Sequence, residues 1–281
     1  MIRKTNPLIK WSLVALSISF TVIMIVLPLV YVMYTAFSGG WKVFAAAVTD
    51  RYALAAVRLT VEVTVITVLI NTVFGLFAAW AITRFAFRGK KLLSALIDLP
   101  LTISPIIAGL IFVLTFGRQS ILYPFLAEHH IKIIFAVPGI VLATIFVTFP
   151  FISREIIPVL NAKGNDEEEA AALMGAGGFT IFRRITFPHI KWAFLYGVVL
   201  CAARAMGEFG AVSVLSGHLR GKTNTMPLHI ELLYQGYDFT GAFAMSALLV
   251  VMAVLILIAR NVFEMRSRRK IRKAAGFQGR V

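Results

Sequence analysis

The chain has 281 residues, of which 59% are hydrophobic and 15% charged, and its formal net charge is +15. A typical soluble domain carries about 25% charged residues, and a soluble chain of this size could not hide so much apolar surface, so the composition excludes a soluble protein and indicates one surrounded by lipid. The basic residues form no stripe interleaved with aromatics, which argues against nucleic acid as a partner, and a single cysteine excludes a disulfide framework or a multi-cysteine metal site.

Six segments each contain about twenty mostly apolar residues, the length that a transmembrane helix requires. They are Trp11–Phe37, Leu59–Thr83, Leu93–Phe116, Ile133–Ile152, Trp192–Leu215 and Ala242–Phe263. The first is too long for the apolar region of a signal peptide, so we keep it as a helix. We therefore predict an all-α integral membrane protein with six transmembrane helices. Its parts are residues 1–58 with the first helix and an external loop, a five-helix core over 59–264, and a basic tail over 265–281.

Lysine and arginine residues gather in alternate connections between these segments. Twenty lie in the two tails, the loop after the second segment and the long loop after the fourth, whereas the opposite connections carry seven. Because positively charged connections stay in the cytoplasm, we predict that both termini and the long loop are cytoplasmic. The tail from Arg266 to Lys273 is also expected to lie against anionic lipid. The external connections are short, so substrate capture is expected to fall to another protein or to the membrane core.

The third segment is interrupted by Pro100 and by the pair Ser104-Pro105. Proline removes a backbone donor and frees a carbonyl group, and within a membrane that group must be satisfied by protein or by water. A broken helix of this kind could line a path through the membrane. For Pro100 alone, a simple proline kink is the alternative interpretation.

Residues 165–188 form the most informative polar interruption of the chain. Asn165 followed by Glu168 has the spacing of a capping box, and carboxylates fill the first turn of a short helix. Gly175 stands where a left-handed C-cap is expected, and Pro188 is predicted to end a second short helix. Composition alone leaves two interpretations, an amphipathic helix resting on lipid headgroups or a knob that inserts into a groove of a partner protein.

The fifth segment holds two charges. Arg204 and Glu208 are four residues apart and are therefore expected on one helix face, where they can pair. Three small residues, Ala203, Gly207 and Ala211, form a stripe along the same helix that lets another helix approach. Intramembrane charges favour a functional interpretation, an anion path whose arginine is held by the glutamate. The alternative is a buried ion pair that only fixes helix packing.

The stretch from Gly217 to Thr223 is similar to a phosphate-binding P-loop but has three residues between its glycines instead of four, and no strand precedes it. We therefore expect no nucleotide hydrolysis by this chain. An enzyme within the membrane would also need clustered histidines, cysteines or carboxylates at one depth, and the sequence has none in view, so we predict a protein that is not an enzyme and holds no metal.

The long loop resembles the EAA loop of ABC-importer permeases, which reads Glu-Ala-Ala, three residues, Gly, nine residues, Ile, two residues, Pro. The matching positions here are Glu169, Ala170, Ala171, Gly175, Ile185 and Pro188. In that family the loop is a cytoplasmic coupling helix, between helices four and five, that docks into the ATPase subunit. The runs Arg204–Val212 and Asp98–Pro105 are similar to sulfate and molybdate permeases, and Phe149-Pro150-Phe151 and Arg220-Gly221 to the CysW-type sulfate/thiosulfate permeases.

This resemblance implies a type I ABC-importer permease in the bacterial plasma (inner) membrane, which moves sulfate or thiosulfate into the cytoplasm by alternating access. Its implied partners are a second, CysT-type permease, two ATPase subunits that bind ATP and Mg, and an extracytoplasmic sulfate/thiosulfate-binding protein, with no cofactor in this chain. The translocation path is expected to include Arg204, Glu208, Ser104 and Pro105. The alternatives are a permease for another oxyanion such as molybdate, or a secondary anion transporter. The latter would need ion-linked carboxylates deep in several segments, where only Glu208 clearly qualifies.

Overall fold

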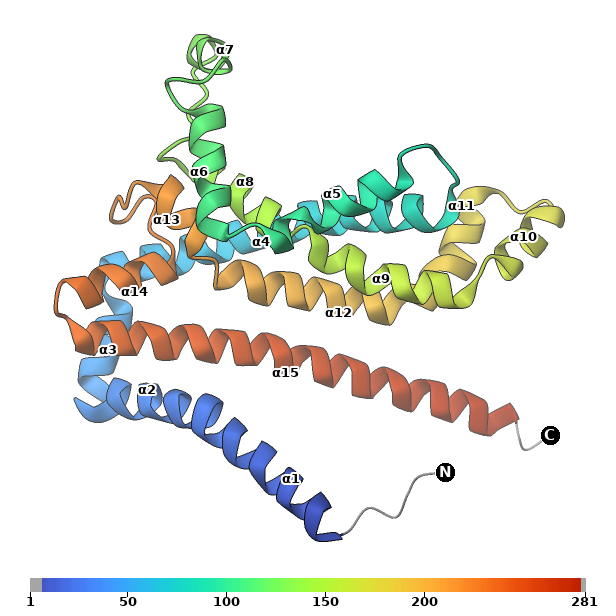
Figure 1. The fold of residues 1–281 in the computed structure, drawn as a ribbon. Coiled ribbons are helices and arrows are strands. Elements are labelled where there is room, and N and C mark those ends of the chain that lie inside the picture. The colour runs from blue at the N-terminus through green and yellow to red at the C-terminus, as the bar shows by residue number, and fades with distance from the viewer. Residues whose placement is uncertain (1–6, 279–281) are drawn as a thin grey trace.

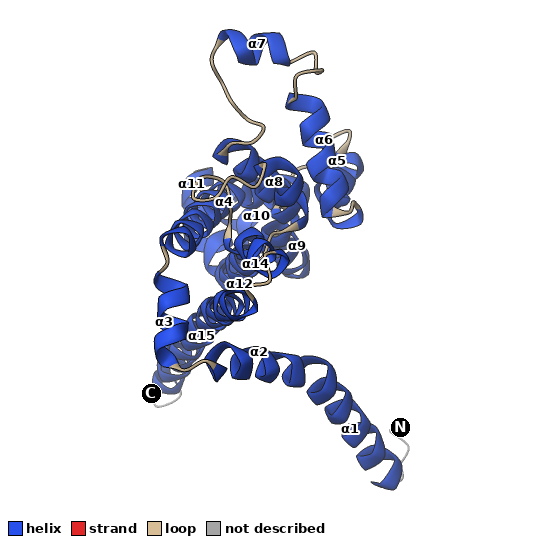
Figure 2. Ribbon diagram, turned by 90° about the vertical axis from the view of Figure 1, so that its left-hand side faces the viewer, coloured by secondary structure: helices blue, strands red, loops and turns tan. Residues whose placement is uncertain are grey.

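The computed structural model describes the backbone of residues 7–278 and the side chains of residues 8–259 and 261. Throughout this part the regular structure is helical (Figures 1 and 2). The helices are α1 Pro7–Thr21, α2 Leu27–Ser38, α3 Trp41–Thr49, α4 Arg51–Arg84, α5 Lys90–Thr102, α6 Pro105–Phe116, α7 Tyr123–Glu128, α8 Val137–Thr148, α9 Pro150–Lys163, α10 Asp166–Leu173, α11 Gly178–Ile181, α12 Phe187–Met206, α13 Gly210–Ser216, α14 Met226–Gln235 and α15 Phe239–Gln278. Short π-helical turns, Val22–Val26 and Phe182–Thr186, join α1 to α2 and α11 to α12.

Five helical segments are long and apolar enough to cross a membrane, and a bent pair of helices makes a sixth if it counts as one span. The five are Leu8–Ser38, Arg51–Arg84, Val137–Lys163, Gly178–Met206 and Phe239–Ala259, and the bent pair is α5 with α6. The predicted all-helical membrane architecture is confirmed. The proposed contact of the tail from Arg266 to Lys273 with lipid concerns side chains outside the described residues.

The third predicted span, Leu93–Phe116, is a broken helix, as its interruptions at Pro100 and Ser104-Pro105 indicated. α5 and α6 meet at an angle of 110°, and Ile103 and Ser104 between them have extended backbone. Pro105 is the first residue of α6, where its missing N–H is tolerated, but its ring disfavours helical geometry in the residue before it. Pro105 therefore produces the sharp corner, whereas Pro100 lies inside α5.

The fourth and fifth spans end elsewhere than predicted. The fourth was expected to end at Ile152, but it continues to Lys163, because Phe149 is helical and Pro150 occupies the first position of α9. The fifth was predicted over Trp192–Leu215. Instead, one helical segment runs from Gly178 to Met206, and α13 is separate.

α4, α9 and α12 pack together at the centre of the molecule (Figures 1 and 2). Their shared core contains Ala79, Ile152, Ile156, Leu160, Ile190 and Cys201. Asn71, which is fully buried in α4, donates from Nδ2 to the Ile145 carbonyl at 3.2 Å and to Thr148 Oγ1 at 2.8 Å in α8. Such hydrogen bonds join helices where lipid gives no hydrophobic driving force between them, so Asn71 fastens α4 to α8.

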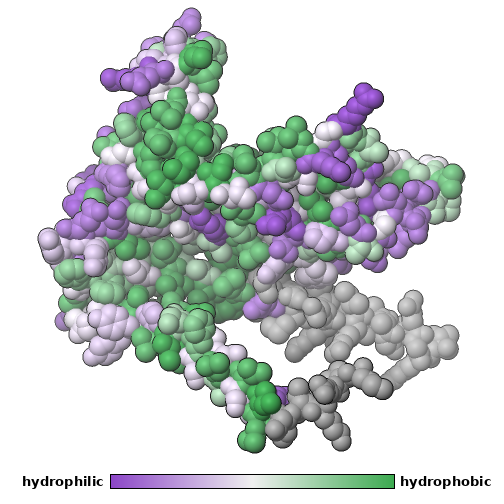
Figure 3. Space-filling view, viewed as in Figure 1, coloured by the Kyte–Doolittle hydropathy of each residue, from purple (hydrophilic) through white to green (hydrophobic). Residues whose placement is uncertain are grey.

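The outer surface is strongly apolar. In the most apolar part of the first span no residue is buried, and α1 extends away from the rest of the molecule (Figure 1). Large apolar side chains such as Leu16, Phe20 and Leu255 are exposed. Figure 3 shows broad hydrophobic areas on the surface. A soluble monomer rarely exposes so much apolar area, so lipid or further helices must cover this surface.

Candidate functional site

The segment 165–188 folds into α10, a glycine turn, and the start of the long helical segment that becomes α12. Gly175 has a φ of +84°, so the predicted left-handed C-cap is confirmed. The N–H of Ala176 donates to the Ala171 carbonyl at 3.0 Å, and that of Gly175 to the Ala172 carbonyl at 2.9 Å. These two bonds make a Schellman motif, which satisfies carbonyls that the end of a helix leaves without partners.

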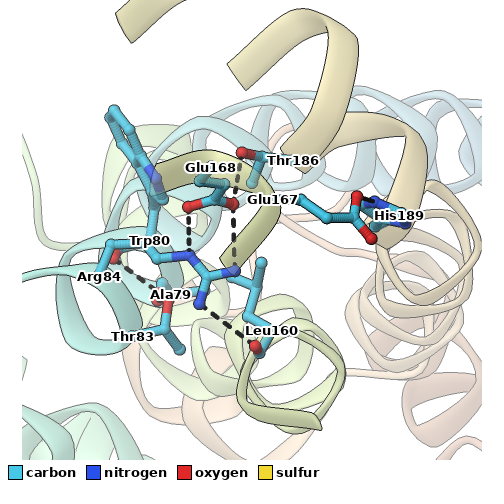
Figure 4. Close-up of polar contacts among 9 residues, drawn as sticks. All are labelled: Ala79, Trp80, Thr83, Arg84, Leu160, Glu167, Glu168, Thr186 and His189. Atoms are coloured by element: carbon cyan, nitrogen blue, oxygen red, sulfur yellow. Dashed lines mark hydrogen bonds and ion pairs between the residues drawn. The ribbon is translucent and has the colours of Figure 1, made fainter. Parts of the chain in front are cut away.

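The predicted capping box is wrong. Asn165 makes no side-chain capping bond in α10, and Glu168 reaches away from the helix to Arg84 at the end of α4 (Figure 4). The Glu168 carboxylate lies 2.8 Å from Arg84 Nε and 3.1 Å from Arg84 Nη2, and it accepts a 2.7 Å hydrogen bond from the Thr186 hydroxyl. A charged partner that donates a charge-assisted hydrogen bond competes successfully with a capping bond to the backbone.

Pro188 does not end a helix, contrary to the prediction. Helical structure continues through it to Met206, with a π-helical turn at Phe182–Thr186 directly before α12. A π turn changes the hydrogen-bonding register, which places Pro188 in the first turn of α12, where a missing N–H costs little.

The other matched positions of the loop lie on different sides of this segment. Ala171 is buried against the rest of the chain, Ile185 is half-buried, and Glu169 and Ala170 are exposed. The side of the turn that faces away from the bundle is apolar, with exposed fractions of 91% for Leu173, 81% for Met174 and 77% for Phe179. These three residues are called the apolar tip below. An exposed apolar cluster beside a short, capped helix is typical of a protein–protein contact.

A second ion pair joins the segment to α12. His189 Nε2 and a Glu167 carboxylate oxygen are 2.7 Å apart, and the hydrogen bond and charge of His189 lower the pKa of Glu167 below its usual range (Figure 4). Glu167 is exposed, so water screens this pair more than the shielded pair of Arg84 and Glu168.

Arg204 and Glu208 form the expected ion pair, with Arg204 Nη1 and Glu208 Oε2 2.6 Å apart. They do not share a helix face, however, because α12 ends at Met206 and Glu208 follows the helix. The other carboxylate oxygen accepts from the Ala211 N–H at 2.9 Å, so Glu208 also caps the first turn of α13. The predicted stripe of Ala203, Gly207 and Ala211 is therefore interrupted as well.

The two interrupted spans meet at these positions. A Cβ added to Gly210 at the start of α13 would lie only 2.9 Å from Pro105 Cβ, so only glycine allows this close approach between α6 and α13. Ser104, which precedes Pro105, is exposed, and its side chain makes no capping hydrogen bond to α6. The corner of the third span therefore lies against the break of the fifth, which brings Pro105 close to the region that holds Glu208. The glutamate side chain is 1% exposed and that of Arg204 33%.

Sequence reasoning missed Arg84 and Thr186 as partners of the loop. Arg84 was counted only as a positive charge that sets orientation, although its position in the last turn of α4 indicates a side chain able to reach helix C-terminal carbonyls. No local pattern pairs it with Glu168, because 84 residues separate them.

Residues 71–272 match the model of a family described as the inner membrane component of binding-protein-dependent transport systems. The chain is 44% identical to the sulfate transport system permease protein CysW of Escherichia coli strain K12, over 94% of this chain and 91% of the relative. It is 32% identical to the sulfate transport system permease protein CysT of Salmonella typhimurium strain LT2, over 91% and 92%.

Among solved structures, a bacterial alginate ABC transporter in complex with its alginate pentasaccharide-bound periplasmic protein superposes with a TM-score of 0.78. The sequence identity is 18%, and the match covers 92% of this chain and 94% of the other. This likeness establishes the type I ABC-importer permease fold that the sequence resemblance implied. Because the family model and the sulfate permeases both match most of the chain, it belongs to the family of inner membrane components of binding-protein-dependent transport systems.

Proposed function

We propose that this chain is a permease subunit of an ATP-driven importer that carries sulfate into the cytoplasm. The observation that carries the proposal is the 44% identity to a sulfate transport permease over more than nine-tenths of both chains. The resemblance of the Arg204–Val212 and Asp98–Pro105 runs to sulfate and molybdate permeases supports the same substrate class. The family comprises membrane components of transport systems, so we assign this subunit to the membrane passage of the anion and ATP hydrolysis to another subunit.

The working importer would contain three further kinds of subunit. A second permease related to CysT would complete the membrane part, since this chain is similar to a CysT protein as well as to CysW. Two ATPase subunits would bind ATP and Mg in the cytoplasm. An external binding protein would deliver the anion, as the periplasmic protein named with the alginate transporter suggests.

The loop 165–188 is the proposed coupling helix. The apolar tip of Leu173, Met174 and Phe179 is the surface that would enter a groove on an ATPase subunit, because it is apolar, exposed and turned away from the bundle. The matched residues Glu169, Ala170 and Gly175 lie in the same turn or beside it. When ATP binding closes the ATPase dimer, the docked loop would carry the spans from the inward-open to the outward-open arrangement.

The proposed anion path runs past the meeting point of the two interrupted spans. A dianion loses a large hydration free energy on entering lipid, so its path needs hydrogen-bond donors and positive potential without a tight site. Arg204 supplies the charge, with Glu208 as its partner at rest. Ser104 adds an exposed hydroxyl, and the extended backbone before Pro105 leaves polar groups unpaired by helix bonds.

We expect both termini and the coupling loop to face the cytoplasm. In a functional variant with Cys201→Ser, a cysteine placed at Lys163 should react with an impermeant thiol reagent only from the cytoplasmic side of membrane vesicles. A cysteine placed at the exposed Lys222, next to the buried Thr223, should react only from outside. The reverse labelling pattern would refute the orientation drawn from the positive charges.

The substrate is tested by uptake of labelled sulfate into cells that contain all four kinds of subunit. Removal of this chain alone should abolish the uptake, and excess unlabelled sulfate or thiosulfate should compete better than molybdate. If molybdate were transported in preference to sulfate, the chain would remain an importer permease but its assignment to sulfate would be wrong.

A further inference from the structure

Arg84 donates two hydrogen bonds and makes one further ion-pair contact to two other elements of the chain (Figure 4). Nε and Nη2 engage both oxygens of Glu168 in α10, and Nη1 donates to the Leu160 carbonyl in α9 at 3.2 Å. The Arg84 side chain is 9% exposed and that of Glu168 16%. Little water therefore reaches this ion pair, and a shielded pair with a charge-assisted hydrogen bond holds its geometry better than an exposed one.

The contacts around Arg84 supply hydrogen-bond partners to groups that the helices alone leave without one. Leu160 lies in the last turn of α9, where helix carbonyls have no helical donor, so Arg84 caps that helix and meets the negative end of its dipole. Thr186, which is 2% exposed, lies in the turn that precedes α12, and its hydroxyl donates a hydrogen bond to Glu168 Oε1. The Glu168 carboxylate and the Arg84 guanidinium group thus join α4, α9, α10 and the π-helical turn before α12. We call this group of contacts the Arg84 clamp.

The chain itself connects α10 only to α9 on one side and, through α11, to α12 on the other. α4 precedes them by a long stretch of sequence, so the chain does not join it directly to the loop. α4 nevertheless forms the centre of the bundle, since it packs against α8, α9 and α12. The Arg84 clamp is the polar contact that fastens the cytoplasmic loop to this central helix.

We propose that Arg84 is a positioning residue that makes α4 move together with the coupling helix, and that Glu168, rather than the neighbouring exposed Glu169, is the carboxylate through which it acts. This inference rests on the proposed function, because it concerns how the docked loop drives the spans. Arginine suits the role, since its guanidinium group donates from Nη2 to the carboxylate and from Nη1 to the α9 carbonyl, while Nε lies beside the second carboxylate oxygen. Lysine offers a point charge and cannot reproduce all three contacts.

The experiment compares variants of the complete importer, in proteoliposomes, by the amount of labelled sulfate taken up per ATP hydrolysed. Arg84→Gln should leave the assembled complex and its ATP hydrolysis largely intact. It should lower sulfate uptake per ATP by about 5- to 150-fold, the range of a typical coupling between sites. Arg84→Lys should give an uptake per ATP between that of the unaltered importer and that of Arg84→Gln. Arg84→Glu combined with Glu168→Arg should recover part of the ratio lost in Arg84→Glu alone.

Arg154→Gln is the matched control, because it removes another arginine paired with a carboxylate. Its partner is Asp98 at 3.4 Å, and both side chains are about half exposed. The control should keep the uptake-to-hydrolysis ratio of the unaltered protein. If Arg84→Gln kept that ratio too, or if uptake, hydrolysis and complex abundance all fell together without rescue by the charge exchange, Arg84 would have only a structural role.

A second measurement follows the geometry of the Arg84 clamp as a distance between two labels and requires no sulfate transport. Nitroxide labels on cysteines at Phe85 and Asp166, both exposed, in the importer carrying Cys201→Ser, report the distance between the end of α4 and the start of α10. This distance should be the same with and without ATP and Mg, and should broaden or shift in Arg84→Gln. A distance that changes with ATP in the intact clamp would overturn the inference. Absence of sulfate uptake by the unaltered importer would contradict the proposed function instead.

Discussion

Replacing Gly175 with valine is expected to abolish most sulfate uptake while the chain still inserts and assembles. Gly175 holds a φ of +84°, where a β-branched residue is strongly disfavoured, and forcing such a residue costs about 1–3 kcal/mol. The chain would relieve this strain by opening the Schellman turn, which would displace Leu173 and Met174 of the apolar tip. If docking depends on that turn, coupling should weaken by about 5- to 150-fold. The measurement is sulfate uptake at equal membrane abundance, with ATP hydrolysis followed in parallel.

Gly89 provides the matched control for this experiment. It is left-handed, with a φ of +94° and a ψ of 2°, and like Gly175 it has open space around the position of a Cβ. Gly89→Val therefore introduces comparable left-handed strain in a different loop, and it should leave hydrolysis and uptake coupled. Normal transport by Gly175→Val would show that the turn does not dock. Equal losses in both variants would show that backbone strain alone, and not the coupling loop, explains the defect.

Replacing Arg204 with methionine is expected to be the most damaging single change in the spans. It leaves Glu208, whose side chain is 1% exposed, as an unpaired buried carboxylate. Breaking a buried pair in this way costs about 3–5 kcal/mol, enough to deplete the assembled importer. Arg204→Met combined with Glu208→Gln should restore assembly, since glutamine can still accept from the Ala211 N–H. If Arg204 serves the anion path, this double variant should assemble but take up sulfate poorly.

The pair of Arg58 and Glu62 is the control, because it has the same four-residue spacing and an N–O distance of 2.7 Å but exposed side chains. Arg58→Met should change abundance little, since water and salt screen an exposed pair and leave it little weight in stability. Near-normal uptake by the Arg204→Met, Glu208→Gln double variant would mean that the ion pair only fixes packing, and Arg204 would then have no role in the path.

The sequence-based prediction succeeded where the determinant is local. The apolar spans follow from composition, and the turn at Gly175 follows from a glycine placed after a run of strong helix formers. It failed where a distant group competes with a local one. Asn165 and Glu168 have the capping-box spacing, yet Glu168 pairs with Arg84, which no local pattern connects to it.

The ends of the spans failed for a related reason. Hydropathy continues past Met206, so a single helix was predicted, but the close contact of Gly210 with Pro105 favours a break in the fifth span. Likewise, Pro188 looks like the end of a helix until the π-helical turn before it shifts the hydrogen-bonding register. These features depend on how neighbouring spans pack, and hydropathy windows contain no information about packing.

The most direct test of the account is sulfate transport by the purified importer in proteoliposomes. The vesicles should contain this chain, the second permease and the ATPase subunits, and the loaded binding protein should be supplied on the side of the external loops. Labelled sulfate should enter only when ATP and Mg are present on the side of the coupling loop. Uptake should end when the binding protein is omitted. Sulfate movement driven by a proton or sodium gradient without ATP would contradict this account and would identify a secondary transporter.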